Sequence, residues 1–510
     1  MFRAPSFAPR LGLSAKNLPP NVLHSEYAVR GELVIRAEQI SKQLLQQEEK
    51  NALNQTNSSF PFAKLIPCNI GNPQAVGAKP LTFHRQVLSV LTSHPSAEMM
   101  VGLQQFPDDA LQRGWKFRSL NPGAYSHSKG VPLFRQMVAD YIDRRDGLDL
   151  NKEANRTNTE HLYLTDGASP AVKTAIELMV KDENDVLLIP IPQYPLYSAT
   201  IARTGGSFVG YEMTEDYDSD KPSWGLDLQN METLIQQELD KKKRVRAIAV
   251  INPGNPTGNV LSRENIEAVL KLAYKYDLVV LADEVYQENV YENVTDKPFL
   301  SFRKVLLESE DTQMKEAVQL FSFHSISKGY YGECGLRGGY MHLTNIPEDV
   351  HAQIYKLCSM FLCSNTIGQG MIASVLNPPN PSDPSFELFD KEKSTTMSQL
   401  KRKAKIVHER LNQMQGMNCM PIEGAMYAFP KVDLPEKFCA EAEKMGKQPD
   451  TWYCIQLLEQ LGLITVPGNG FGQKANTYHF RTTILPPEEE LVPMLDRLER
   501  FQEELHEKYK

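Results

Sequence analysis

Two hydrophobic patterns alternate through the middle of the chain. Short, nearly continuous apolar runs are typical of strands that are buried on both faces of a sheet. Four such runs lie at 185–190, 245–251, 277–282 and 318–323, and a shorter one lies at 161–164. Between 245–251 and 277–282 the apolar residues follow helical spacing, at Ile266, Val269, Leu270 and Ala273. This succession predicts an α/β fold with a mostly parallel sheet and helices on both faces.

The pattern changes in the last third of the chain. A proline-rich break at 377–384 follows the fourth run, and a long helical stretch comes after it. A final helix is predicted by an apolar face made of Leu491, Met494, Leu495, Leu498, Phe501 and Leu505. Near the other end, residues 44–59 are rich in Gln, Asn and Glu, which indicates a polar helix end and a loop.

Length, charge and cysteine usage exclude several classes of protein. A chain of 510 residues is too long for one simple core, so two or more lobes are expected. The net charge of −8 gives no broad basic surface for nucleic acid, and no apolar run approaches the roughly 20 residues of a membrane span. The seven cysteines are scattered, without a Cys-x-x-Cys pair, which favours reduced thiols and predicts neither disulfides nor a metal site.

Residues 1–25 have the composition of a leader segment. They carry Arg3, Arg10 and Lys16 and no acidic residue, a composition found in mitochondrial transit peptides. Four prolines in the same stretch interrupt the amphipathic helix that such a peptide needs. The sequence therefore predicts a cytoplasmic protein, with the mitochondrial matrix as the alternative.

The most informative chemistry follows the fourth apolar run. That run ends in a glycine-rich turn carrying Ser325, Ser327, Lys328 and Arg337. A lysine that leaves a buried strand can anchor an aldehyde cofactor, and hydroxyls beside a guanidinium suit a phosphate dianion. This turn resembles the Schiff-base segment of the fold-type I pyridoxal-phosphate aminotransferases, with Lys328 as the catalytic lysine. The string at 332–339 resembles the alanine aminotransferase branch of that family, apart from Leu336, where a polar residue is expected.

The resemblance implies the domain organisation. A flexible leader at 1–25 precedes an N-terminal arm and part of a small domain at 26–99. The large cofactor-binding domain is expected at 100–360, and the rest of the small α/β domain at 361–510.

Further motifs resemble the cofactor-binding segments of the same family. Asp283 follows the third run, so it lies at the carboxyl end of a strand, where α/β proteins bind ligands. By resemblance Asp283 pairs with the ring nitrogen of the cofactor, while Tyr286 and Asn255 bind its 3′-oxygen. The ring of Tyr194 covers the pyridine face, and Tyr197 is interpreted as a packing residue. The implied phosphate site comprises Gly167, Ala168, Ser169, Ser325, Ser327 and Arg337.

Two more motifs concern the substrate and one concerns a second subunit. By resemblance Gly71 turns a backbone amide toward the substrate carboxylate, and Arg481 binds that carboxylate with two hydrogen bonds. Tyr125 reaches the phosphate of a neighbouring subunit, which implies a homodimer with shared active sites. His127, in the same segment, is interpreted as a loop hydrogen-bonder.

The implied activity is ping-pong transamination. L-Alanine and 2-oxoglutarate give pyruvate and L-glutamate, with Lys328 moving the Cα proton. One alternative is another small-amino-acid transaminase, such as one that uses glyoxylate and glutamate. A cofactor-binding protein without turnover is a second alternative, although it would be expected to lack Lys328, Asp283 or Arg481.

Overall fold

The computed structural model describes residues 18–23, 25, 31–51, 60–94, 102–103, 105–217, 222–292 and 294–510. Most of the predicted leader and the loop at 52–59 therefore lie outside the described residues. A short helix, α1 (Pro20–Leu23), belongs to the end of the leader segment and packs on α8 (Leu196–Thr204).

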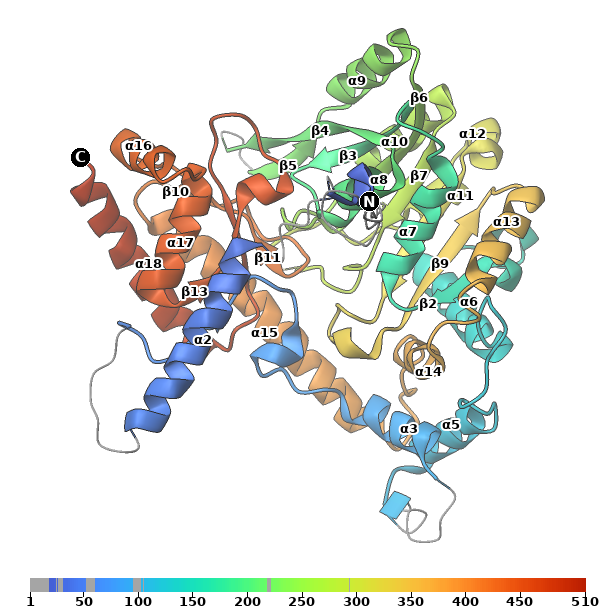
Figure 1. Cartoon of the computed structure of the whole chain (residues 1–510). Helices are drawn as coiled ribbons and strands as arrows, with labels where there is room; N and C mark the ends of the chain where they lie inside the picture. The colour runs from blue at the N-terminus through green and yellow to red at the C-terminus, as the bar shows by residue number, and fades with distance from the viewer. Residues whose placement is uncertain are drawn as a thin grey trace, which may run out of the picture.

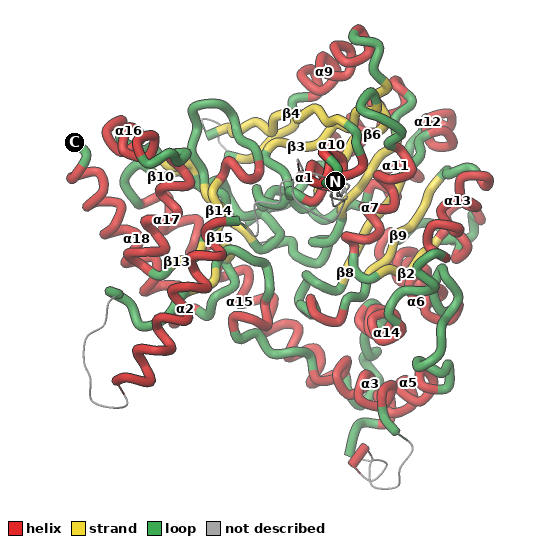
Figure 2. Tube along the Cα trace, in the orientation of Figure 1, coloured by secondary structure: helices red, strands yellow, loops and turns green. Residues whose placement is uncertain are grey.

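An eight-stranded sheet forms the centre of the molecule, with the order β2-β9-β8-β7-β6-β3-β4-β5 (Figure 2). Its strands are β2 (Leu162–Thr165), β3 (Asp185–Ile191), β4 (Ser207–Asp216), β5 (Ser223–Leu226), β6 (Arg244–Ile251), β7 (Val279–Asp283), β8 (Leu320–Ser325) and β9 (Gly339–Thr344). Neighbours from β4 to β8 pair in parallel, whereas β9 is antiparallel to β8 and β2, and β5 is antiparallel to β4. The prediction of an α/β fold with a mostly parallel sheet is confirmed.

The predicted strands are confirmed with small shifts that have local causes. β7 starts at Val279 because Asp277, in the left-handed conformation, ends α10 (Arg263–Tyr276). β8 starts at Leu320 because Val318 ends α12 (Thr312–Ala317). The predicted cap of α10 is also present, since the Ser262 side chain accepts a hydrogen bond from the Asn265 amide.

Helices cover both faces of the sheet because alternate strand residues point to opposite sides. Leu187, Ala247 and Leu281 pack in a cluster with α7 (Ala168–Met179), α8 and α13 (Glu348–Ser359). Leu188, Ile248 and Val280 pack in another with α9 (Leu228–Asp240), α10, α11 (Phe302–Glu308) and α12. A further cluster lies at the β2 edge and includes α3 (Thr82–Thr92), α5 (Asp108–Arg118), α6 (Pro132–Asp146) and α14 (Thr366–Val375).

Both ends of the chain contribute to a separate hydrophobic cluster. It contains α2 (Glu32–Asn51), α15 (Phe386–Gln413), α16 (Glu436–Lys444), α17 (Pro449–Leu461) and α18 (Glu488–Lys508). Short sheets pack with them: β1 (Ile66–Pro67) with β13 (Leu463–Ile464), β10 (Met417–Asn418) with β12 (Lys431–Val432), and β11 (Tyr427–Ala428) with β15 (Phe480–Thr483) and β14 (Val466–Pro467). Figure 1 shows blue α2 beside red α17, with α15 running from this cluster toward α3. The boundaries of the two domains stay a prediction.

Other sequence expectations concern single features. The predicted apolar face of α18 is buried along its length. All seven cysteines are free thiols. Among the described residues, no helix is both long enough and apolar enough to cross a membrane.

Candidate active site

A cavity of about 320 Å³ opens where the parallel strands end. Carboxyl ends of parallel strands meet at one edge of a sheet, so the loops after β3, β6, β7 and β8 converge there. Predicted site residues make up most of its wall: Gly71, Ala168, Ser169, Tyr194, Asn255, Asp283, Tyr286, Ser325, Ser327, Lys328, Arg337 and Arg481. Gly167 and Tyr125 do not line it.

One side of the cavity is rich in hydrogen-bond donors. The Ser325 hydroxyl donates to the Ser327 hydroxyl at 2.8 Å, and the Arg337 guanidinium lies beside them, 3.4 Å from Ser327. Gly167, with φ 80°, precedes the first turn of α7; a Cβ there would lie 2.6 Å from Arg337 Nη2. Glycine is therefore needed for the close approach, and the free amides of α7 add further donors. This side can bind an anion such as a phosphate.

Leu336, the apolar departure noted in the sequence, does not line the cavity. It packs against the cluster of α3, α5, α6 and α14, which explains a hydrophobic residue there. Arg337 after it adopts the left-handed conformation and donates to the carbonyls of Cys334 and Asp166, at 2.9 and 3.0 Å.

Asp283 ends β7 at the floor of the cavity. Its Oδ2 accepts a hydrogen bond from the Tyr197 hydroxyl at 3.1 Å, and its buried Oδ1 has no side-chain hydrogen-bond partner among the described residues. Burial raises the pKa of Asp283 to about 6, against the opposing effect of the Tyr197 hydrogen bond. Such a carboxylate favours a cationic partner. The interpretation of Tyr197 as a packing residue was incomplete, because its hydroxyl fixes Asp283.

Lys328 follows the end of β8 and points across the cavity. Its Nζ donates a hydrogen bond to the Gly71 carbonyl and lies 5.9 Å from the centroid of the Tyr286 ring. The next residue, Gly329, has φ 74° and donates its amide to Asn289 Oδ1 at 2.7 Å. The turn therefore holds the lysine stem, while the amine remains at the cavity wall.

Arg481 of β15 lines the same cavity and is only 2% exposed. Its Nη1 donates to Asn255 Oδ1 at 3.0 Å and its Nη2 donates to the Asn69 carbonyl. Its Nε is buried without a hydrogen-bond partner in the described part of the chain. Among the described residues Arg481 has no ion-pair partner, and a buried guanidinium with a spare donor is suited to a carboxylate ligand.

Seven lining residues were not among the predicted site residues: Ile70, Asn72, Leu196, Ile251, Val285, Cys334 and Tyr427. Asn72 adjoins a predicted residue, and Cys334 lies inside the lysine segment, where its thiol donates to the Ser327 carbonyl at 2.8 Å. Tyr427 lies in the apolar stretch 424–429, and no local pattern separates it from a core tyrosine. Only the pairing of β11 with β15 brings it to Arg481.

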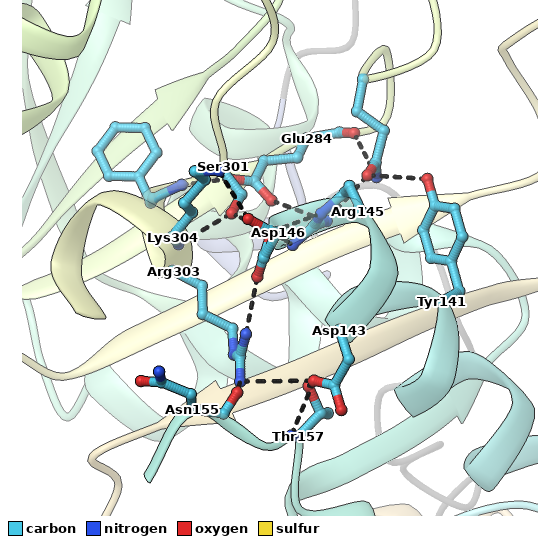
Figure 3. A network of polar contacts seen from close by, with 12 residues as sticks. Tyr141, Asp143, Arg145, Asp146, Asn155, Thr157, Glu284, Ser301, Arg303 and Lys304 are labelled. Atoms are coloured by element: carbon cyan, nitrogen blue, oxygen red, sulfur yellow. Dashed lines mark hydrogen bonds and ion pairs between the residues drawn. The ribbon is translucent and has the colours of Figure 1, made fainter. Parts of the chain in front are cut away.

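A buried polar network lies just beyond the end of β7, whose last residue is Asp283 (Figure 3). The next residue, Glu284, accepts the Phe302 amide at 2.8 Å and lies 3.7 Å from Arg145 Nη1. Asp146 is fully buried and accepts hydrogen bonds from Arg145, Arg303 and Ser301. These contacts tie α6 and the start of α11 to the end of β7.

A histidine cluster outside this cavity bears on the expectation of no metal site. His161, Glu348 and His351 offer ligand atoms within 4.8 Å of one another. The two imidazole rings stack at 4.3 Å with planes 25° apart, so their in-plane lone pairs do not converge on one point. Because a metal ion lies in the plane of each imidazole that binds it, this geometry is one of ring stacking.

Sequence comparisons reach nearly the whole chain. The family model "Aminotransferase class I and II" matches residues 115–498. The chain is 44% identical to a probable mitochondrial alanine aminotransferase of Dictyostelium discoideum, over 98% of this chain and 90% of that protein. It is 42% identical to glutamate–glyoxylate aminotransferase 1 of Arabidopsis thaliana, over 98% and 97%.

Comparison with solved structures agrees with the sequence comparisons. An alanine aminotransferase structure from Pyrococcus furiosus matches with a TM-score of 0.71 and 25% identity, covering 96% of this chain and all of that one. The resemblance stated from the motifs is thereby confirmed. With the family model spanning most of the sequence, and close relatives spanning nearly all of it, the chain belongs to the class I and II aminotransferase family.

Proposed function

We propose that this protein transfers an amino group from L-alanine to 2-oxoglutarate, giving pyruvate and L-glutamate, with pyridoxal phosphate as its cofactor. The observation that carries the proposal is the convergence of Lys328, Asp283 and Arg481 on one cavity. Several relatives named alanine aminotransferase support it.

The cavity fits the cofactor of the family at both ends. Asp283 Oδ1 is a buried acceptor without a side-chain partner among the described residues, which suits a protonated ring nitrogen. The close approach of Gly167 to Arg337, with Ser325 and Ser327 alongside, suits a phosphate. Residues proposed to hold the group are Tyr125 of a second subunit, Gly167, Ala168, Ser169, Tyr194, Asn255, Asp283, Tyr286, Ser325, Ser327, Lys328 and Arg337.

When bound, pyridoxal phosphate supplies an aldehyde that condenses with amines and a ring that withdraws electrons from the substrate Cα–H bond. Asp283 keeps its charge opposite a cation, because an unpaired buried carboxylate is costly. Tyr286 and Asn255, joined by a hydrogen bond of 3.4 Å, present donors to the same side of the cavity.

Proton transfer falls to Lys328. Its Nζ takes the proton from Cα of the amino acid that gives up its amino group, and in the other half-reaction it delivers a proton to Cα of the amino acid that is formed. Both steps need an amine that is mobile at its tip and anchored at its base. Arg481 orients the substrate by its carboxylate, so that the Cα–H bond points to that amine. Alanine, pyruvate, glutamate and 2-oxoglutarate share this carboxylate, so one arginine serves both half-reactions.

The direct test is spectroscopic. The purified protein loaded with pyridoxal phosphate should change its visible absorbance when L-alanine is added, and L-alanine plus 2-oxoglutarate should yield pyruvate. Lys328→Ala should abolish turnover, and borohydride should label Lys328 in the wild type. Labelling of another lysine would contradict the assignment.

Glyoxylate remains the second candidate acceptor, because relatives named for glutamate and glyoxylate are as similar as several alanine aminotransferases. Competition between 2-oxoglutarate, pyruvate and glyoxylate in the same assay separates the two. A higher kcat/KM for glyoxylate with glutamate than for pyruvate with glutamate would favour the second candidate.

We further propose a homodimer with shared sites, supported by an exposed apolar surface. Tyr125 is 79% exposed and Phe361 78% exposed. Their segments lie together, because Ser128 donates to the Leu362 carbonyl and the His127 ring stacks on Tyr355. An apolar surface of this kind favours an interface between subunits. A cytoplasmic location, with the mitochondrial matrix as the alternative, and the division into domains at 100 and 360 belong to the same proposal.

A further inference from the structure

Tyr427 occupies a position that joins the two halves of the cavity. It belongs to β11, pairs with Thr483 of β15, and is 3% exposed. Its side chain lines the cavity between Arg481 and Tyr286. The sequence alone assigned it no role.

The ring of Tyr427 fixes the plane of the Arg481 guanidinium. Arg481 Cζ lies 4.3 Å from the centroid of the Tyr427 ring and 4.7 Å from that of the Phe471 ring, so two aromatic rings pack against the guanidinium. With Nη1 on Asn255 and Nη2 on the Asn69 carbonyl, the guanidinium has little freedom to turn. Its remaining N–H groups are available to a carboxylate in a fixed direction.

The hydroxyl of Tyr427 closes a circuit of polar contacts. It accepts a hydrogen bond from the Tyr286 hydroxyl at 3.2 Å. Tyr286 in turn accepts from Asn255 Nδ2 at 3.4 Å, and Asn255 Oδ1 accepts from Arg481 at 3.0 Å. Hydrogen bonds therefore lead from Arg481 through Asn255 and Tyr286 to the Tyr427 hydroxyl, and the circuit closes through the contact of the Tyr427 ring with the Arg481 guanidinium.

Two nearby cations and the hydrogen bond from Tyr286 act on the Tyr427 hydroxyl. Burial opposes its ionisation, but Lys328, Arg481 and the hydrogen bond from Tyr286 together lower the pKa of Tyr427 below its ordinary value. Burial raises the pKa of Tyr286, the donor of the pair. A carboxylate that neutralises Arg481 removes part of the positive charge beside the Tyr427 hydroxyl, so its oxygen becomes a better acceptor and holds the Tyr286 proton more firmly.

We propose that Tyr427 is a positioning residue that transmits the binding of a substrate carboxylate at Arg481 to the hydroxyl of Tyr286. The inference rests on the proposed function, because it assigns the carboxylate to Arg481 and the cofactor to the Tyr286 side. Tyr427 thereby couples substrate recognition to the state of the cofactor-facing phenol.

The test uses propionate, which carries a carboxylate but no amino group and so cannot be turned over. The pH midpoint of the holoenzyme absorbance is measured with and without saturating propionate. In the wild type the added negative charge should raise this midpoint by about one pH unit, a tenfold coupling within the usual range. Tyr427→Phe should lose at least half of that shift, because only the direct charge effect remains.

Two variants serve as matched controls. Phe471→Leu removes an aromatic contact of Arg481 but leaves the hydroxyl circuit, so it should weaken propionate binding several-fold and keep the full shift at saturation. Tyr286→Phe should lose the same part of the shift as Tyr427→Phe, and the double variant should lose no more. Calorimetry on cofactor-free protein should show propionate affinity within twofold of wild type for Tyr427→Phe.

The outcomes are distinguishable. A full shift in Tyr427→Phe would overturn the coupling while leaving the proposed function intact. Wild-type protein that develops no visible absorbance with pyridoxal phosphate would overturn the proposed function and this inference with it. Additive losses in the double variant would show two independent effects, which also contradicts the circuit.

Discussion

Asp283 illustrates how a single residue is tuned by its surroundings. It is 4% exposed, one oxygen is held by Tyr197, and burial raises its pKa to about 6. A carboxylate in this state is ready to accept a cation and costly to leave alone.

Asp283→Asn should therefore lose activity by several orders of magnitude. The amide keeps the size and can still accept from Tyr197, but it cannot hold a proton on a ring nitrogen. Removal of the buried charge partner should raise the barrier by roughly 3–5 kcal/mol. Steady-state kinetics at saturating cofactor measures it, with Tyr197→Phe as a milder control that keeps the charge. Near-normal turnover in Asp283→Asn would contradict the role.

Arg481→Lys tests recognition of the carboxylate. Lysine is a point charge and lacks the planar pair of donors, so kcat/KM should fall for alanine, pyruvate, glutamate and 2-oxoglutarate alike. The corresponding loss of transition-state stabilisation should be roughly 2–4 kcal/mol. The absorbance of the bound cofactor should hardly change. Stopped-flow measurement of both half-reactions decides the matter. If only the dicarboxylates are affected, Arg481 binds the distal carboxylate instead.

The sequence predicted residues that stand in distinctive local motifs and missed those defined by contacts across the fold. Lys328 and Asp283 each come at the end of an apolar run that predicts a strand, so their position at the carboxyl edge of the sheet could be inferred. Tyr427 stands on a two-residue strand, and its partner Arg481 is separated from it by α16 and α17. No local pattern encodes that pairing.

At the scale of elements, β7 is held at its carboxyl end by the network of Figure 3. Glu284 turns away from the cavity toward Arg145 of α6 and the amide of Phe302 in α11. Burial raises the pKa of Glu284 to about 7, although Arg145 opposes the shift. The carboxyl group of Glu284 thus links the end of β7 to α6 and α11.

Glu284→Gln should change how stability depends on pH. An acid whose folded pKa is raised keeps its proton longer in the folded state, so its contribution to stability is full below the unfolded pKa and is lost as pH rises toward 7. Chemical denaturation of the cofactor-free protein between pH 4.5 and 7 should show that stability changes with pH more negatively in the wild type than in Glu284→Gln, by up to about one proton, or about 1.4 kcal/mol per pH unit. Glutamine can still accept the Phe302 amide. An unchanged slope would contradict the raised pKa.

Element boundaries followed from local signals where those signals exist. The cap at Ser262 and the periodic face of α18 could be read directly, because capping and amphipathicity are local properties. The short strands β1, β10, β11 and β14 could not, because two-residue pairings depend on tertiary contacts.

At the scale of the whole molecule, the position of Tyr125 bears on whether the active site is shared between two subunits or contained in one. Tyr125 lies outside the cavity of its own chain and lines a separate hollow of about 230 Å³ with neighbours such as Phe117 and Thr366. Its ring is exposed and does not line the cavity that contains Lys328, which agrees with the proposal that it serves a second copy. In a shared arrangement, each active site is complete only when the other subunit supplies a residue to it.

Mixing Tyr125→Phe subunits with Lys328→Ala subunits tests this arrangement. If the sites are shared, each hybrid dimer contains one site with both lesions and one site with neither, so activity should return on mixing. Random pairing of equal amounts should restore about a quarter of the wild-type sites. Self-contained sites would leave every hybrid site with one lesion, and no activity would be regained. Sedimentation of the unmixed proteins gives the matching control, because a monomer there would rule out sharing altogether.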